Sequence, residues 1–270
     1  MLGRDVARAA ASVNHEVVAL SRADLDVLDA RAVEAVMAAE RPDAVVNCSA
    51  WTDVDGAESA EAEATRLNGE AAGILAEAAQ AVDATVVYPS TDYVFDGTKR
   101  GPYIESDAPS PQTAYGRSKL AGERATAAAG PRHFVVRTSW LFGAGGSNFV
   151  ETMLRLGDDL GEVVVVRDQV GCPTYTSHLA EGVVRLLDTG LHGTHHLAGG
   201  GECSWYEFAV EIFRMAGSET RVLSCTTDEF PRPARRPAYS VLGTEIDYPI
   251  VLPEWREGLA DYLTERAAVR

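Results

Sequence analysis

The chain has 270 residues, of which 46% are hydrophobic, and a formal net charge of −16 at pH 7. This length fits one large domain, or a main domain with a smaller lobe, and the composition supplies a sizeable core. The acidic balance argues against nucleic acid as a partner, because phosphate backbones are bound by basic surfaces. No stretch approaches the roughly 20 apolar residues that a membrane span needs.

Cysteine usage and the amino terminus bear on the compartment. The cysteines are far apart in the sequence: Cys48, Cys172, Cys203 and Cys225. This spacing fits neither a zinc finger nor a disulfide scaffold, and the first residues lack the pattern of a signal peptide. His192, His195 and His196 resemble a metal cluster, but adjacent strand residues point to opposite faces, so we interpret them as structural. We therefore predict a cytoplasmic protein without a metal.

Strand and helix patterns alternate through the first half of the chain. In order, they are strand 16–20, helix 30–40, strand 43–47, helix 57–81, strand 85–88, the helix with Tyr115 and Lys119, strand 133–137 and helix 148–156. This alternation is typical of βαβ units, whose parallel sheets bind ligands at the carboxyl ends of their strands. The sequence predicts a doubly wound, Rossmann-like α/β domain.

The alternation loosens after about residue 143. The remaining predicted elements are strand 162–166, helix 177–188, a strand from residue 195, helix 204–215 and helix 254–266. Ser204 and Glu207 have the spacing of a capping box, and the prolines of 230–237 predict an extended loop. We expect residues 1–143 to form the dinucleotide-binding domain, and 144–270 to form mainly a substrate-binding lobe that shares some elements with it.

Tyr115 and Lys119 are four residues apart, so on a helix the phenol and the ammonium share one face. A phenol with a pKa near 10 is a poor acid or base at neutral pH, and a nearby cation favours its ionised form. Thr91 ends an apolar run and supplies a hydroxyl opposite them. Together these groups suit the reduction of a ketone by a nicotinamide hydride. The alternative is a packed ring beside a solvated amine.

The amino terminus departs from the usual opening of a dinucleotide-binding fold. That opening is an apolar strand, a glycine-rich turn and a helix whose amino terminus receives the pyrophosphate. Here the chain begins at the last glycine, Gly3, already inside the helix. We expect a truncated or mis-started version, and the alternative is a protein that lost its phosphate cradle. Without that central strand, two neighbouring strands lose their pairing.

Two basic features concern anionic groups. Ser21 and Arg22 follow strand 16–20, and no acidic residue comes directly after that strand. An arginine at this place can bind the 2′-phosphate of NADP. This favours NADPH over NADH, although Arg22 also fits a solvated surface position. Three arginines lie within residues 232–236, and their planar forks suit the diphosphate of a nucleotide sugar. The alternative is a basic loop paired with nearby acids.

The chain resembles the dTDP-4-dehydrorhamnose reductases, of the extended short-chain dehydrogenase/reductase superfamily. The matching segments are 2–5, 41–47, 54–59, 90–97, 111–123, 137–143, 168–174, 204–209 and 233–240. The resemblance covers nearly the whole chain, but only Gly3 remains of the Gly-x-x-Gly-x-x-Gly turn.

The resemblance implies a catalytic triad of Thr91, Tyr115 and Lys119. Tyr115 would protonate the C4 oxygen, Lys119 would hold the nicotinamide ribose and lower the phenol pKa, and Thr91 would bond the carbonyl oxygen. The implied cofactor contacts, besides Tyr115 and Lys119, are Gly3, Asp26, Val27, Cys48, Ser49 and Ala50. The implied or expected substrate contacts, besides Thr91, are Asp92, Trp140, Arg235 and Arg236. For residues 48–50 strand-end packing is the alternative, and for Trp140 it is a place in the core.

The resemblance further implies reduction of the C4 ketone of dTDP-4-dehydro-L-rhamnose to dTDP-L-rhamnose, with NADPH or NADH as the cofactor. One alternative is another dTDP-4-keto-6-deoxyhexose reductase, of secondary metabolism. The other is a non-catalytic homologue that acts as a regulatory subunit. The expected partner is a dTDP-linked 4-keto-6-deoxy sugar, and a homodimer is left open.

Overall fold

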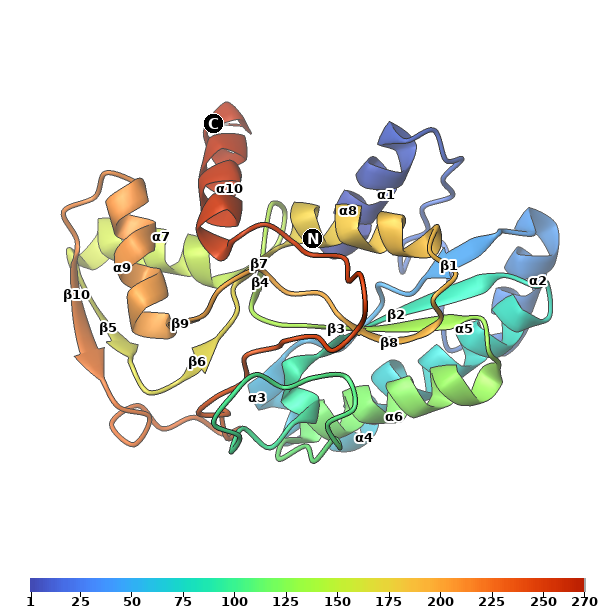
Figure 1. Ribbon diagram of the computed structural model, residues 1–270, viewed down its shortest axis with the longest axis horizontal. Helices are drawn as coiled ribbons and strands as arrows, with labels where there is room; N and C mark the ends of the chain where they lie inside the picture. Colours follow the sequence, from blue (N-terminus) through green and yellow to red (C-terminus); the bar gives the residue numbers. More distant parts are fainter. Residues whose placement is uncertain (270) are drawn as a thin grey trace.

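The computed structural model describes residues 1–269, and its centre is a parallel four-stranded sheet (Figure 1). The strands follow the order β1 (Ala44–Val46), β2 (Thr85–Thr91), β3 (His133–Thr138) and β8 (Gly193–His196). Every neighbouring pair is parallel. The sheet is doubly covered, so its apolar runs, such as Val86 and Val87 in β2 and Phe134 in β3, are buried. The α/β prediction is confirmed.

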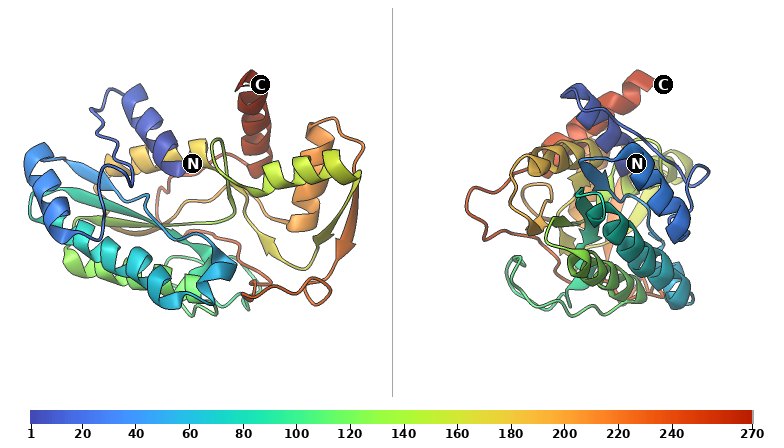
Figure 2. Two further views of the ribbon diagram at one scale, coloured as in Figure 1. Left: turned by 180° about the vertical axis from the view of Figure 1, so that it is seen from behind. Right: turned by 90° about the vertical axis from the view of Figure 1, so that its right-hand side faces the viewer.

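Helices cover both faces of this sheet (Figures 1 and 2). One face carries α1 (Leu2–Ser12) and α8 (Thr176–Leu187), which pack on each other. The other carries α5 (Ala71–Gln80) and α6 (Ala114–Ala129), and α2 (Ala30–Glu40) packs against α5. Since α8 and β8 come from the second half of the chain, that half contributes to the central sheet as expected.

Polar caps fix where several of these helices begin. Each capping side chain accepts a hydrogen bond from a backbone N–H of the first turn, as that turn requires. The capping residues are Asp29 for α2, Thr113 for α6, Asn148 for α7 (Phe149–Leu160) and Ser204 for α9 (Trp205–Met215). The capping box predicted for Ser204 and Glu207 is confirmed.

The single helix predicted over 57–81 is instead four segments. They are α3 (Val54–Ala57), α4 (Glu61–Thr65), a π-helical turn η1 (Arg66–Glu70) and α5. The wider π turn carries Asn68 and Gly69 into the interior, where Asn68 finds polar partners. Helical periodicity alone does not reveal such a turn, because π turns interrupt the helix locally.

The strand predicted over 16–20 is absent among the described residues. Residues 15–21 have no regular structure, and Val17, Val18 and Leu20 are 39, 53 and 46% exposed. Within residues 1–269, β1 pairs only with β2, so it is an edge strand. Residues 16–20 form no ladder with it or with any other described strand. A strand without a ladder partner leaves its backbone groups to solvent.

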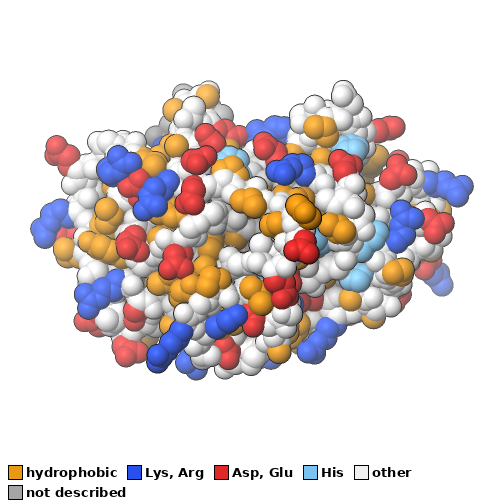
Figure 3. Space-filling model, viewed as in Figure 1, with side chains coloured by type: hydrophobic (Ala, Val, Ile, Leu, Met, Phe, Trp, Pro, Cys, Tyr) orange, Lys and Arg blue, Asp and Glu red, His pale blue; other side chains and the backbone are white. Residues whose placement is uncertain are grey.

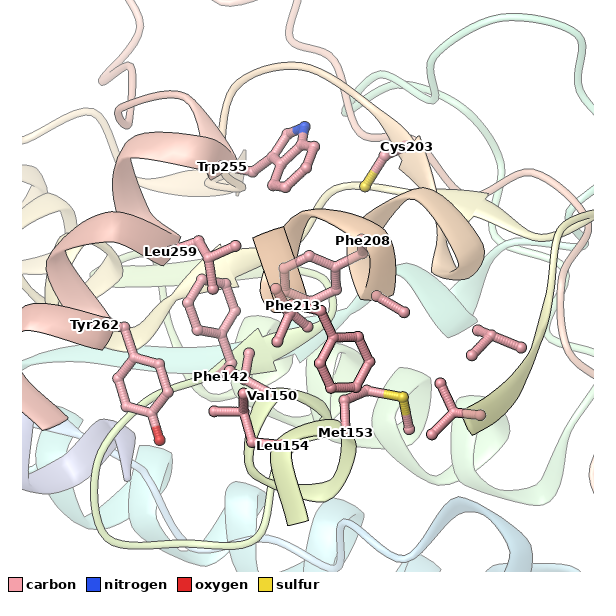
Figure 4. Packing of buried hydrophobic residues seen from close by; sticks show 14 of the residues in the cluster. Phe142, Val150, Met153, Leu154, Cys203, Phe208, Phe213, Trp255, Leu259 and Tyr262 are labelled. Carbon is pink, nitrogen blue, oxygen red and sulfur yellow. The ribbon is translucent and has the colours of Figure 1, made fainter. Parts of the chain in front are cut away.

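The second lobe is built around a small parallel pair, β5 (Glu162–Val166) and β10 (Arg221–Cys225). Helices α7, α9 and α10 (Trp255–Val269) surround it, and their apolar faces meet in one cluster that includes Phe142, Phe208 and Trp255 (Figure 4). Short strands complete the connections between the lobes: β4 (Leu141–Phe142) with β7 (Thr174–Tyr175), and β6 (Val170–Gly171) with β9 (Cys203–Ser204). The extended loop predicted over 230–237 is confirmed. No helix within residues 1–269 is long and apolar enough to cross a membrane.

A buried ion pair joins β3 to α6. The guanidinium of Arg137 donates two hydrogen bonds to the Glu123 carboxylate, at 2.9 and 2.8 Å, and both residues are about 95% buried. The Ser90 hydroxyl donates to the same carboxylate at 2.5 Å. A bidentate, fully hydrogen-bonded pair of this kind tolerates burial, whereas either partner alone would not.

Replacing Arg137 by Met should lower the free energy of unfolding by about 3–5 kcal/mol, because it leaves the Glu123 carboxylate buried without its cation. Urea denaturation followed by circular dichroism measures the change. The double variant Arg137→Met with Glu123→Leu should recover most of the loss. Arg221→Ala, which breaks an exposed pair with Glu162, should change stability by no more than about 1 kcal/mol. Equal losses in all three variants would contradict the assignment.

Candidate active site

The structure brings Thr91 and Tyr115 together at the carboxyl end of β2. Thr91 ends the strand and caps η2 (Asp92–Val94), while Tyr115 lies in the first turn of α6. The Thr91 hydroxyl donates to the Asp92 carboxylate at 3.0 Å, and it lies close enough to the Tyr115 phenol to lower the pKa of that phenol. The Tyr115 ring also meets the edge of Tyr93, with ring centroids 5.7 Å apart. Thr91 and Tyr115 thus lie near one strand end, and their catalytic role stays a prediction.

Two glycines of α6 allow this helix to approach β2 closely. A Cβ on Gly116 would lie 2.2 Å from the carbonyl oxygen of Tyr93. A Cβ on Gly122 would lie 2.2 Å from both the Tyr88 hydroxyl and the Asn68 carbonyl oxygen. Any larger residue at either position would push the helix away, and Tyr115 and Lys119 would move with it.

Lys119 is buried on the same face of α6, and its ammonium points into the protein. Its Nζ donates to the carbonyl oxygen of Pro89 at 2.7 Å and lies 4.0 Å from the centroid of the Tyr88 ring. Burial lowers the pKa of Lys119 to about 7, although the charges of Glu123 and Cys48 oppose that shift. A substantial fraction of this amine is therefore neutral at pH 7.

The prediction that Lys119 lowers the phenol pKa is wrong for the ligand-free chain. Burial raises the pKa of Tyr115 to about 12, and the hydrogen bond with Thr91 only partly offsets the rise. The partly neutral amine of Lys119 is engaged by Pro89 and Tyr88, so desolvation outweighs the effect of a cation. Tyr115 thus keeps its proton at neutral pH.

Asp92 shares the buried site with Thr91. It is 2% exposed, and burial raises its pKa to about 6, although the nearby Ser240 and Thr91 hydroxyls act to lower it. Ser240 lies at the end of the second lobe's long loop, so the two halves of the chain meet at this carboxylate. Its contact with the sugar stays a prediction.

The predicted cofactor residues fall into two groups. Cys48 follows β1 and lies against Gly3 of α1, where a Cβ on the glycine would be 3.2 Å from the Cys48 Cβ. The side chain keeps an exposed face, yet desolvation around its thiol raises the pKa to about 11, and the charges of Lys119 and the amino terminus oppose this. Ser49 donates to the Asn47 side chain, and Ala50 follows it.

Asp26 and Val27 lie apart from this group. Asp26 accepts from the backbone N–H of Leu28 in a local turn, and Val27 packs against the apolar cluster of α2 and α5. Among the described residues, their contacts do not join them to Tyr115 or Lys119. Their cofactor role stays a prediction.

Asn68 is a site residue that the sequence interpretation missed. Its side chain accepts from the Trp51 backbone N–H at 2.8 Å and donates to the Trp51 carbonyl at 3.1 Å. It also donates to the Ser118 hydroxyl on α6 at 2.8 Å. Asn68 thereby ties the loop after β1 to the helix of Tyr115. The signal in the sequence that could have indicated this role is that Asn68 is the one side-chain amide among residues 64–79.

Trp140 and the arginines approach from the second lobe. Trp140 has a positive φ of 47° and stacks on Trp205, with ring centroids 3.5 Å apart and 5° between the planes. Arg235 is exposed, whereas Arg236 donates to Asp55 at 3.0 Å. Acidic and basic side chains are interspersed on the face drawn in Figure 3, and that face shows no broad basic surface.

The three histidines make contacts of a structural kind. His195 Nε2 lies 2.6 Å from the carbonyl oxygen of Leu191, and His196 Nδ1 lies 2.8 Å from that of Gly243. His192 and His195 pack on the Phe134 ring. Within residues 1–269, no group of three His, Cys, Asp or Glu side chains could hold a metal ion.

Known proteins match this chain over nearly its whole length, in sequence and in structure. The family model of the RmlD substrate binding domain matches residues 1–268. A dTDP-4-dehydrorhamnose reductase of Streptomyces griseus is 45% identical over 249 residues, which cover 90% of this chain and 82% of the relative.

Two solved structures are similar over nearly their full length. A dTDP-4-dehydrorhamnose reductase of Clostridium acetobutylicum has a TM-score of 0.96 and 43% identity, covering 98% of this chain and 96% of that one. The enzyme of the same name from Bacillus anthracis, in complex with NADP, has a TM-score of 0.95 and 38% identity, covering 98% and 95%.

Replacing Lys119 by Met tests the buried amine. Because the folded pKa of about 7 lies below the unfolded value near 10.5, the unfolded state binds more protons between these values, and the native chain gains stability as pH rises through them. The unfolding free energy of Lys119→Met minus that of the native chain should therefore be largest below pH 7 and shrink toward pH 10. Urea denaturation from pH 6 to 9.5 measures it, and a constant difference would contradict the buried amine.

Proposed function

The chain belongs to the family of the RmlD substrate binding domain, that of the dTDP-4-dehydrorhamnose reductases, and we propose that it reduces the C4 ketone of dTDP-4-dehydro-L-rhamnose to dTDP-L-rhamnose with NADPH. One observation carries the proposal for this chain. Thr91 ends β2, and Tyr115 lies in the first turn of α6, the helix that carries the buried Lys119; the two hydroxyls are close enough for Thr91 to lower the pKa of the phenol. Two hydroxyls beside an amine can bind a carbonyl oxygen and supply its proton.

In this reaction the C4 carbon gains a hydride and its oxygen gains a proton. We assign the proton to Tyr115, which is protonated at neutral pH because burial raises its pKa to about 12. As the ketone oxygen becomes an alkoxide, it becomes basic enough to take a proton from such a phenol. Thr91 donates a hydrogen bond to the same oxygen, and Lys119 then favours the phenolate that Tyr115 leaves behind.

The residues present fit the nicotinamide end of NADPH, which supplies the hydride when bound. Cys48 and Ser49 follow β1, and Lys119 lies near Cys48. Gly3, at the start of α1, packs against Cys48 and has no side chain at this point. Our proposed cofactor contacts remain Gly3, Asp26, Val27, Cys48, Ser49, Ala50, Tyr115 and Lys119. NADPH is supported by the NADP complex of the Bacillus anthracis relative.

The proposed substrate contacts are Thr91, Asp92, Trp140, Arg235 and Arg236. Asp92 and Thr91 face the sugar, Trp140 forms a wall, and Arg235 and Arg236 bind the diphosphate. Arginine side chains supply the bidentate donors that phosphates require, in a chain whose net charge is −16. We further propose residues 1–143 as the dinucleotide-binding domain and 144–270 as mainly the substrate lobe.

The setting of the reaction is also part of the proposal. The four free thiols, Cys48, Cys172, Cys203 and Cys225, support a cytoplasmic location, where reducing conditions keep cysteines unpaired. We propose a homodimer as the state to test by light scattering. Identification of the product that this chain forms would decide between dTDP-L-rhamnose and another dTDP-linked 6-deoxyhexose, since the same triad serves both reactions.

Tyr115→Phe should lower kcat by at least about 100-fold, because it removes the proton donor and little else. NADPH binding, measured by fluorescence, should change by less than about twofold. Tyr248→Phe, at a residue that is 97% exposed, is the matched control and should keep full activity. Failure of the native chain to turn over a dTDP-4-keto sugar, while it still binds NADPH, would favour the regulatory-subunit alternative.

Coenzyme choice should depend on Arg22. Arg22→Ala should reduce kcat/KM for NADPH about tenfold and leave that for NADH unchanged, because only NADPH carries the 2′-phosphate. Steady-state rates with each coenzyme measure this. A native preference for NADH, or equal losses with both coenzymes, would contradict the role of Arg22.

A further inference from the structure

One carboxylate of the first lobe, that of Asp55, binds the arginine segment, residues 230–240, at several points. Asp55 lies on α3, in the segment 54–59 to which the proposed mechanism gives no role. It accepts hydrogen bonds from Arg232 at 3.0 and 2.5 Å, from Arg236 at 3.0 Å and from the Ala234 backbone N–H at 3.1 Å. Four hydrogen bonds from one segment converge on one side chain.

This contact crosses between the two lobes of the molecule. The chain that leaves β10 in the second lobe runs along the base of the molecule to α3 in the first (Figure 1). Gly97 fixes the same segment at its other end: its φ is +76°, and a Cβ there would lie 2.5 Å from Pro237. The Tyr239 N–H donates to the Gly97 carbonyl. Asp55 therefore holds the segment at its arginines, and Gly97 holds it just after them, at Pro237 and Tyr239.

The pinned arginines are close to the reacting groups. The charges of Arg236 and Asp55 both act on the buried phenol of Tyr93, and Tyr93 packs edge-on against Tyr115. The Asp55 side chain is 17% exposed, like that of Arg236, while Arg232 is 48% exposed. Asp55 thus lies beneath the segment, and the arginines lie over it.

We propose that Asp55 is a positioning residue for the anionic end of the substrate: it fixes Arg232 and Arg236, and with them Arg235, in the arrangement that receives the diphosphate. The inference rests on the proposed function, and it adds to that function a residue that touches neither the sugar nor the cofactor. Asp55 holds the guanidinium groups before the ligand arrives.

Charge and geometry favour positioning over competition with the ligand. Three arginines and one carboxylate leave two net positive charges for a diphosphate. Among the described residues, Arg232 Nη1 and Arg236 Nε make no hydrogen bond, so each guanidinium keeps a donor while Asp55 holds it. Without the carboxylate, the arginines would repel one another, and binding would have to order three long side chains.

The experiment measures dTDP binding by calorimetry and steady-state kinetics with the dTDP-4-keto sugar. Asp55→Asn keeps the shape and an acceptor for the Ala234 N–H but removes the charge. It should raise the Kd for dTDP and the KM for the sugar about tenfold, with kcat and NADPH affinity within about twofold. Asp55→Glu, which restores the charge, should recover part of the loss.

A structural control separates positioning from general loosening. Glu162→Gln breaks an exposed pair with Arg221 in the second lobe and should leave all these constants unchanged. Hydrogen exchange should quicken in residues 230–240 of Asp55→Asn, since the pinning charge is lost.

Unchanged or tighter dTDP binding by Asp55→Asn, while the native chain binds dTDP, would overturn this inference alone. A kcat that falls as much as kcat/KM would also overturn it, because that pattern marks a general disturbance of the catalytic groups. If the native chain neither binds dTDP nor turns over the sugar, the proposed function fails, and this inference fails with it.

Discussion

The burial of the Lys119 amine is the constraint on which the surrounding packing of β2, β3 and α6 depends. An amine that is 4% exposed is stable only if the surrounding protein supplies a carbonyl, an aromatic face and a nearby carboxylate. The end of β2 supplies the first two, through Pro89 and Tyr88, and α6 itself supplies Glu123. Glu123 must in turn be buried, which requires Arg137 on β3. The site and the core of the sheet are thus one electrostatic unit.

The same arrangement explains why the tyrosine is close to the threonine. Helix α6 can approach β2 only because Gly116 and Gly122 present no side chain, and this approach brings the Tyr115 phenol to Thr91. Asn68 in the π turn then fixes the loop after β1 against α6. Close packing of α6 at its glycines, together with the buried side chain of Asn68, therefore positions Tyr115 near Thr91.

The second lobe completes the site from the opposite direction. Its own apolar core, which includes Phe142 and Phe208, gives it rigidity independent of the sheet (Figure 4). From this base it extends Trp140, stacked on Trp205, and the arginine segment bound by Asp55. The proposed proton donor, Tyr115, and the proposed phosphate-binding arginines therefore lie on separate elements, α6 and the segment 230–240.

The sequence by itself determined most of the order of strands and helices, the capping box of α9 and the position of Thr91 at a strand end, because these depend on local periodicity and on the meeting of strand ends in a parallel sheet. It did not determine the π turn at Asn68, the irregular path of 16–20 or the high pKa of Tyr115. The first depends on partners distant in sequence, the second on the unpaired edge of β1, and the third on burial. Only tertiary structure assigned Asp55 to the arginines, since 177 residues separate it from Arg232 and only the folded chain brings them together.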